Sequence, residues 1–157
     1  MKTTVWKPYL LFVLLAEAVG ALAGFLTKYA MASYDVLLKS SLTPPDIVFP
    51  VVWVILYALM GIGAARVYLA PPSAARTRSL WLFAAQLAVN FFWSLLFFNR
   101  QAFGLAFIWL VLLWVLVLAM ILSFAKTDRR AALLQIPYLL WVTFAGYLNF
   151  AVWQLNR

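Results

Sequence analysis

Five long runs of apolar residues, separated by short charged segments, constrain the fold of this chain more than any other feature. The chain has 157 residues, of which 68% are hydrophobic and 10% charged, whereas an average soluble domain carries roughly 25% charged residues. About 20 apolar residues in a helix span a bilayer, and a chain in lipid must satisfy its backbone hydrogen bonds internally. The runs predict an all-α membrane protein, a bundle of five transmembrane helices in a single domain, 1–157. The expected helices are residues 8–26, 45–69, 79–99, 101–125 and 131–155.

The inventory of reactive side chains excludes several classes of site. The chain has no Cys and no His, which excludes disulfides, thiolate or imidazole metal sites, and Ser-His-Asp or Cys-His catalysis. Its four acids are Glu17, Asp35, Asp46 and Asp128, a poor basis for carboxylate catalysis. We therefore expect no metal site and no required cofactor. Glu17 interrupts the first apolar run, where an ionisable residue indicates either a functional role or a protonated acid bonded to a neighbour.

The basic residues predict how the chain is oriented. The net charge is +8, and the Lys and Arg residues lie almost entirely between the apolar runs. This suits topology control and anionic headgroups better than nucleic acid. One side carries Lys2, Lys7, Arg66, Arg76, Arg78, Lys126, Arg129 and Arg130, and the other carries Lys28, Lys39, Arg100 and Arg157. Positive charge is enriched in cytoplasmic loops, so we expect a cytoplasmic N-terminus and an outer loop at 27–44.

The segment TPPD, residues 43–46, has the composition of a helix start. Thr43 is a suitable N-cap, Pro44 suits the first helical position, and Asp46 falls where a capping-box acid would lie. Pro50 follows about one turn later and is expected to kink the helix or leave a carbonyl unpaired. The second helix should therefore begin directly beneath the long loop.

Aromatic and amide side chains are predicted to meet in the outer half of the bundle. Because successive helices alternate in direction, three helices bring such groups to a similar depth, namely Trp53, Tyr57, Asn90, Trp93, Ser94, Trp141 and Asn149. Residues three or four apart share a helix face. Taken singly, each residue is explained by helix packing. Together they predict a cavity with aromatic walls and the loop 27–44 as its lid, suited to a large planar apolar ligand with polar handles.

Three segments carry a resemblance to a known family. They read YDVLLKSSLTPPDIVFPVVWVILYALMGIGAARV, AAQLAVNFFWSLLFF and PYLLWVTFAGYLNFAVWQLN. Together they resemble the TspO/MBR family of tryptophan-rich sensory proteins and translocator proteins, which includes the former peripheral-type benzodiazepine receptor. The resemblance implies five transmembrane helices, a bacterial-type member in the cell membrane, and a pocket beneath the first loop. Carried over by motif, the ligand-binding residues are Tyr34, Trp53, Tyr57, Asn90, Trp93, Ser94, Trp141, Ala145 and Leu148.

The resemblance also implies a function. The favoured hypothesis is a membrane receptor or carrier for porphyrins such as protoporphyrin IX or a haem-like tetrapyrrole, and for sterols or other lipophilic ligands, in sensing, sequestration or transport. One alternative is a porphyrin-degrading enzyme that uses light, oxygen and the pocket tryptophans, although no acid–base pair supports ordinary catalysis. Another is a small secondary transporter, although five helices do not divide into two equal repeats. By the resemblance, the sterol-recognition segment of the mitochondrial members falls on LNFAVWQ, where Phe150 and Gln154 replace a Tyr and an Arg, which argues against cholesterol as the native ligand.

Partners follow from the same reasoning. We expect a lipophilic small molecule, membrane lipids and a second copy of the chain, and no nucleic acid. Small residues four apart allow helices to approach closely in lipid. Such pairs occur at Gly20 and Gly24 and at Ala84 and Ala88. The resemblance favours a homodimer through the helix that carries the alanines.

Overall fold

A computed structural model describes residues 4–157 of the chain. Lys2, one of the basic residues used to predict the orientation, lies outside the described residues. Five helical segments in the described part are long and apolar enough to cross a membrane, and no strand occurs there. The predicted all-α bundle of five transmembrane helices is therefore confirmed. The elements are α1 (Trp6–Thr27), η2 (Lys28–Ala30), α2 (Met31–Asp35), α3 (Val48–Tyr68), α4 (Ala74–Ser94), η3 (Leu95–Asn99), α5 (Phe103–Ala125), α6 (Arg129–Leu133) and α7 (Ile136–Leu155).

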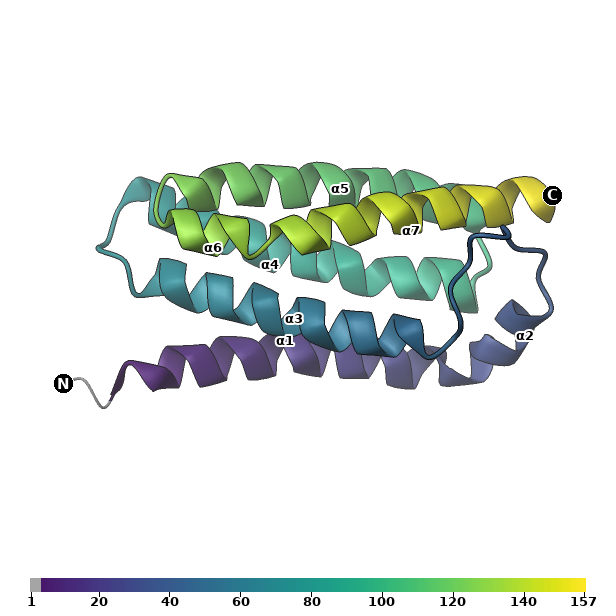
Figure 1. Cartoon of the computed structure of the whole chain (residues 1–157), viewed down its shortest axis with the longest axis horizontal. Helices are drawn as coiled ribbons and strands as arrows, with labels where there is room; N and C mark the ends of the chain where they lie inside the picture. The colour runs from purple at the N-terminus through teal and green to yellow at the C-terminus, as the bar shows by residue number, and fades with distance from the viewer. Residues whose placement is uncertain (1–3) are drawn as a thin grey trace.

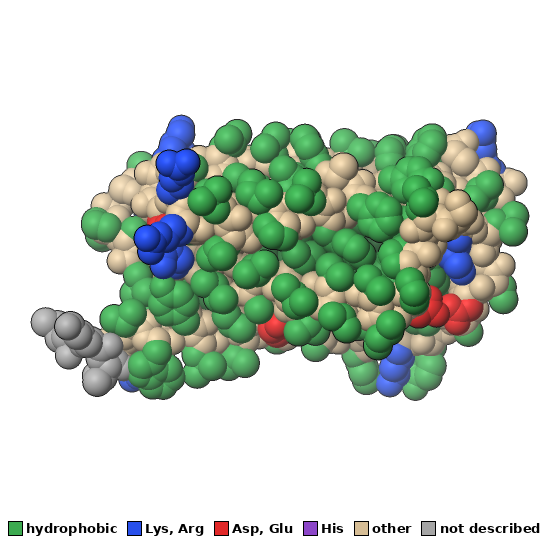
Figure 2. Space-filling model, viewed as in Figure 1, with side chains coloured by type: hydrophobic (Ala, Val, Ile, Leu, Met, Phe, Trp, Pro, Cys, Tyr) green, Lys and Arg blue, Asp and Glu red, His purple; other side chains and the backbone are tan. Residues whose placement is uncertain are grey.

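The long helices lie side by side along one axis, and the two termini lie at opposite ends of the bundle (Figure 1). Helix α1 packs on α3, α4 packs on α5, and α5 packs on α7. The end of the bundle that carries α2 and the C-terminus is called the lid end below. Charged side chains gather at both ends, and apolar side chains cover most of the face between them (Figure 2). This distribution is the one that a bilayer requires.

Helix α3 begins later than the TPPD signal predicted. Its first residue is Val48, no side chain caps it, and the N–H of Val48 donates to Pro45 O at 3.0 Å. The prediction of Thr43 as N-cap is therefore wrong. A residue that precedes a proline is driven out of the helical region, and Thr43 and Pro44 both precede one. Pro50 consequently falls in the first turn of α3, where its missing N–H costs no intrahelical hydrogen bond.

Two further helix boundaries differ from the apolar runs. Helix α4 starts at Ala74 because the Ser73 hydroxyl caps it, accepting from the N–H of Arg76 at 3.0 Å. Its first turn is polar, so hydropathy alone placed the start later. The last run is divided into α6 and α7. Pro137 lies in the first turn of α7, and its ring excludes a continuous helix through this point.

The segment expected as a loop at 27–44 is helical in its first part. The helical conformation continues from α1 through η2 and α2 as far as Asp35, and an irregular stretch then crosses the end of the bundle toward α7 (Figure 1). Asn156 holds this stretch by accepting from Leu38 N at 3.0 Å and donating to Leu38 O at 2.8 Å. The Ser40 hydroxyl lies 2.8 Å from that of Tyr147. The lid is therefore tied to α7 by side-chain hydrogen bonds.

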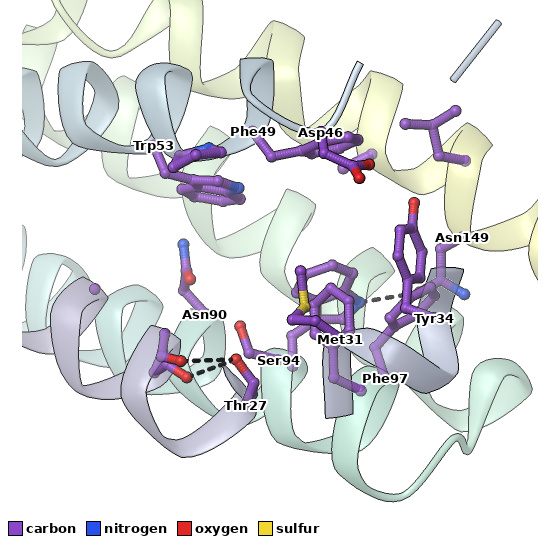
Figure 3. A pocket seen from close by; sticks show the side chains of 18 of the residues that line it. Thr27, Met31, Tyr34, Asp46, Phe49, Trp53, Asn90, Ser94, Phe97 and Asn149 are labelled. Carbon is purple, nitrogen blue, oxygen red and sulfur yellow. Dashed lines mark hydrogen bonds between the residues drawn. The ribbon is translucent and has the colours of Figure 1, made fainter. Parts of the chain in front are cut away.

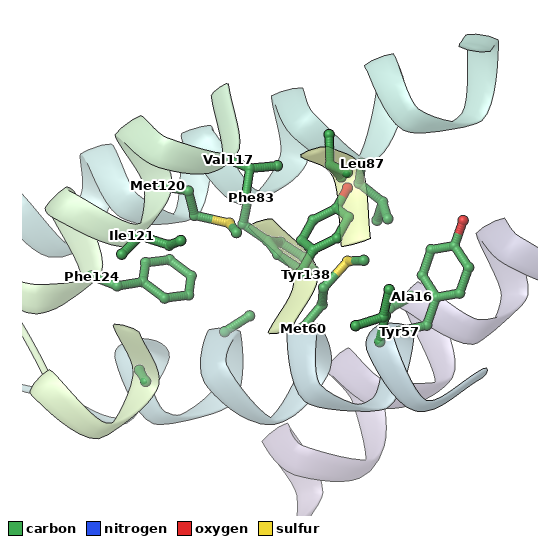
Figure 4. Close-up of a cluster of buried hydrophobic side chains, with 14 of the residues drawn as sticks. Ala16, Tyr57, Met60, Phe83, Leu87, Val117, Met120, Ile121, Phe124 and Tyr138 are labelled. Carbon is green, nitrogen blue, oxygen red and sulfur yellow. The ribbon is translucent and has the colours of Figure 1, made fainter. Parts of the chain in front are cut away.

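The half of the bundle away from the lid holds a dry apolar core. Side chains from α3, α4 and α5 interlock there (Figure 4), and Met60, Met120 and Phe124 are completely buried. Gly61 allows α1 and α3 to touch, because a Cβ on Gly61 would lie 2.6 Å from Val13 N. Close packing at this end leaves the lid end as the place where the helices enclose space.

Candidate ligand-binding cavity

A cavity of about 690 Å³ lies beneath the lid, between α1, α3, α4, η3 and α7. Ligand sites in proteins commonly have volumes of about 300–1,000 Å³. In Figure 3, Phe49 and Trp53 of α3, with Asp46 just before that helix, lie along one side, and Asn90, Ser94 and Phe97 lie on the opposite side. Met31 and Tyr34 of α2 close the lid end of this space. The cavity therefore has two long walls and a helical cover.

Eight of the nine residues carried over by motif line this cavity. They are Tyr34, Trp53, Tyr57, Asn90, Trp93, Ser94, Ala145 and Leu148. The ninth, Trp141, is not among the lining residues. Its ring packs edge-on against Phe49, which does line the cavity, with ring centroids 5.9 Å apart. Trp141 therefore lies behind the wall rather than in it.

The rotation of α7 explains the position of Trp141. The buried residues of this helix are Tyr138, Val142, Leu148, Asn149 and Val152, and Ala145 lies on the same face at helical spacing. Of the residues that the motifs suggested, Ala145 and Leu148 therefore stay on the cavity side, and Trp141 alone lies at the edge of this face. Tyr138 is the important residue that was missed. Its spacing to Asn149 in the sequence is the signal that could have found it.

A chain of buried hydrogen bonds forms the floor of the cavity. The Tyr57 hydroxyl donates to Asn90 Oδ1 at 3.0 Å, and Asn90 Nδ2 donates to the Tyr138 hydroxyl at 2.7 Å. The Tyr138 hydroxyl in turn donates to Gln86 Oε1 at 2.7 Å. Buried polar groups that are fully paired fix the positions of their helices. The network therefore holds α3, α4 and α7 in register around the cavity.

A second polar group connects the cavity wall to α5. The indole Nε1 of Trp93 donates to Asn149 Oδ1 at 2.9 Å, and Asn149 Nδ2 donates to Phe103 O at 2.9 Å. Asn149 also lines the cavity. Because its amide is occupied on both sides, it positions the Trp93 ring instead of offering a free group to a ligand.

Aromatic rings cover both walls. On α3, the rings of Trp53 and Tyr57 lie 5.5 Å apart at 32°. On the other side, the Trp93 ring stacks on Phe97, with centroids 5.2 Å apart at 27°. Phe97 belongs to η3, a π-helical turn, and such turns are frequent at functional sites. The walls present flat apolar surfaces to whatever the cavity holds.

The charges near the cavity are unevenly distributed. Glu17 and Asp46 line it, whereas none of the described lining residues is a Lys or Arg. Lys39 lies behind the lid residue Tyr34, with its Nζ 4.4 Å from the ring centroid and 3.0 Å from the carbonyl oxygen. No group of three or more His, Cys, Asp or Glu residues able to hold a metal occurs in residues 4–157.

An ion pair lies at the opposite end of the molecule, between Arg66 Nη2 and Asp128 Oδ2 at 3.1 Å. Partial burial alone would raise the pKa of the Asp128 carboxyl. The N–H of Ala131 and the Arg66 guanidinium outweigh that effect and hold this pKa below its ordinary value. Asp128 also caps α6 by accepting from Ala131 N at 3.0 Å. This site fixes a helix start and has no connection to the cavity.

Fold and cavity together define a five-helix membrane protein with an aromatic pocket beneath a helical lid. The model of the TspO/MBR family matches residues 12–154, and the chain belongs to that family. It is 42% identical over 144 residues to the tryptophan-rich protein TspO of Chlorobaculum tepidum, covering 90% of this chain and 91% of the relative. It is 40% identical over 157 residues to protein CrtK of Rhodobacter capsulatus, covering 99% and 95%. It is 34% identical over 155 residues to the translocator protein of Bos taurus, covering 97% and 92%.

Proposed function

We propose that this protein is a membrane receptor or carrier that binds porphyrins, with a protoporphyrin IX-like tetrapyrrole in the cavity beneath the lid. The observation that carries the proposal is the aromatic cavity of about 690 Å³. A tetrapyrrole is a large, flat, mostly apolar molecule, and aromatic side chains favour offset stacking on such surfaces. The ring pairs Trp53–Tyr57 and Trp93–Phe97 supply a flat surface on each wall.

The cavity also suits a ligand that enters and leaves. Its cover is a short helix and an irregular segment, tied to α7 by a few hydrogen bonds at the surface. Segments held by few buried contacts open more readily than a packed core. The name of the bovine relative, translocator protein, agrees with movement of a ligand through such a site. Sensing, sequestration and transport all begin with this binding step.

The test is a titration of the purified full chain with protoporphyrin IX in mild detergent, in the dark and in light. We expect saturable quenching of tryptophan fluorescence and a pigment absorption spectrum that is the same in both conditions. Protein-free micelles give the matched blank, because the pigment also partitions into detergent. Absence of saturable quenching above this blank would contradict the proposal.

A porphyrin-degrading enzyme is the second candidate, and the position of two tryptophans favours it. Trp53 lines the cavity, and Trp141 lies directly behind Phe49 with a buried indole Nε1 that has no hydrogen-bond partner among the described residues. In the same titration, a new absorbing product formed only in light and oxygen would identify turnover. Its absence under illumination would leave the receptor or carrier.

We further propose that the lid faces the outside of a bacterial cell and that the N-terminus lies in the cytoplasm. Six of the basic residues assigned to the inner side lie at the end opposite the lid, in the α3–α4 and α5–α6 connections or the adjoining helix ends. A cysteine at the exposed Ser41 in the lid should react with a membrane-impermeant maleimide in intact cells. Reaction only after lysis would reverse the orientation.

A further inference from the structure

Glu17 is an acidic residue within α1, a helix long and apolar enough to span a membrane, and the proposed function leaves it without a role. It lies near the middle of α1 and lines the cavity. Lys7 and Lys28 are ten and eleven residues away along the helix, which at a rise of 1.5 Å per residue corresponds to about 15 Å each. The carboxyl group therefore sits at the level where the bilayer is most apolar.

No group within residues 4–157 forms an ion pair with this carboxyl. Among residues 4–157 the only ion pair joins Arg66 and Asp128, and the side chain of Glu17 takes part in no hydrogen bond there. The described lining residues include no Lys or Arg. Acidic residues inside membranes normally pair with one another or with other polar groups. A cationic ligand bound in the cavity would supply the partner that Glu17 lacks.

Aromatic rings line the same part of the cavity as Glu17. Gly20 is three residues further along α1 and shares its face with Glu17. The absence of a Cβ on Gly20 makes room for the Tyr57 ring, which packs directly against this position. The Trp53 ring lies 5.5 Å from that of Tyr57. A carboxylate in the same cavity as Trp and Tyr rings is a combination suited to organic cations, because aromatic faces attract positive charge.

We propose that the cavity binds lipophilic organic cations, with Glu17 as the counter-ion and the rings of Trp53 and Tyr57 around the apolar body of the ligand. An unpaired charge is costly at this depth, and a bound cation removes that cost for both partners. The proposal does not require that a tetrapyrrole be the natural ligand. It adds a second class of ligand, lipophilic cations, to the same cavity.

Two ions of nearly the same shape and opposite charge provide the test. Tetraphenylphosphonium and tetraphenylborate are titrated by equilibrium dialysis against the purified full chain in mild detergent, with protein-free micelles as the blank. We expect saturable binding of tetraphenylphosphonium, with tetraphenylborate weaker by about tenfold or more. Equal binding of the two ions would overturn the proposal without any variant being needed.

Variants then assign the selectivity to one side chain. Glu17→Gln should weaken tetraphenylphosphonium binding by about tenfold, and Glu17→Asp should retain part of it. The matched control is Asp35→Asn, which removes the same charge from an exposed lid residue outside the cavity lining. Cation binding by Glu17→Gln at the wild-type affinity would overturn the assignment. Protoporphyrin IX binding by the same variants separates the two proposals, since loss of cation binding alone leaves the tetrapyrrole site intact.

Discussion

Replacing Trp53 by alanine is the sharpest test of the cavity as a ligand site. One side of the Trp53 ring faces Tyr57, and Tyr138 meets it at 72° with centroids 6.2 Å apart. The remaining surface borders the cavity. By analogy with the stacking of a base on an aromatic side chain, its loss should cost roughly 1–3 kcal/mol of binding free energy. That corresponds to a dissociation constant for protoporphyrin IX about five- to 150-fold higher.

Three further variants make the measurement specific. Trp53→Phe keeps a ring and should be milder than Trp53→Ala. Trp141→Ala should also be milder, because Trp141 reaches the cavity only through Phe49. Trp114→Ala is the control, since this residue donates to the exposed Thr143 hydroxyl and lies outside the cavity lining. Affinity is measured by fluorescence quenching after circular dichroism has shown that each variant is folded. Equal affinities of Trp53→Ala and Trp114→Ala would refute the reasoning.

Three other predictions concern the framework around the cavity. Tyr138→Phe removes a hydroxyl that forms hydrogen bonds with two buried amide groups. Its loss should cost about 1–3 kcal/mol of stability for each group left unpaired and lower the thermal midpoint in detergent. A midpoint equal to that of the wild type would show that the network is dispensable. Ala84 and Ala88 are exposed on α4, so Ala84→Leu combined with Ala88→Leu should convert a homodimer into monomers by light scattering, and an unchanged dimer would exclude this face. Asp128→Ala removes a helix cap worth about 1 kcal/mol and an ion pair, so it should lower the free energy of unfolding. Because the folded-state pKa of this carboxyl is lowered from 3.8, the charge-dependent part of that loss should be full above pH 3.8 and vanish as the pH falls through the folded-state pKa. A difference in stability between wild type and variant that grew on acidification would contradict this sign.

The number of helices and the depth of the pocket residues follow from the sequence alone. The bilayer offers no partner for backbone polar groups, which leaves helices and closed barrels, and continuous apolar runs of this length favour helices over the short alternating strands of a barrel. Alternating directions then bring Trp53, Asn90 and Trp93 to one level, where the structure places all three around one cavity. These properties depend on length, composition and order along the chain, so no knowledge of packing is needed.

The start of each helix depends on more than hydropathy. Helix α3 begins only after Pro44 and Pro45, at Val48, and α4 begins in a charged turn because Ser73 caps it. In both cases a local hydrogen bond or a steric exclusion sets the first residue of the helix, and the boundary of the apolar run does not. The capping residue and the prolines are visible in the sequence, but which of them determines the helix start is seen only in the structure.

The rotation of α7 and the isolation of Glu17 were decided by the tertiary structure. All sides of α7 are rich in apolar or aromatic residues, so its sequence does not show which side faces inward. The buried network through Tyr138 selects the side, because two amide groups of α4 need its hydroxyl, and Trp141 is turned behind the wall as a result. Whether the Glu17 carboxyl has a partner likewise depends on which side chains the other helices place at the same depth. They bring the aromatic rings of Trp53 and Tyr57 and no positive charge, because every Lys and Arg of the described chain lies near a helix end or in a connection.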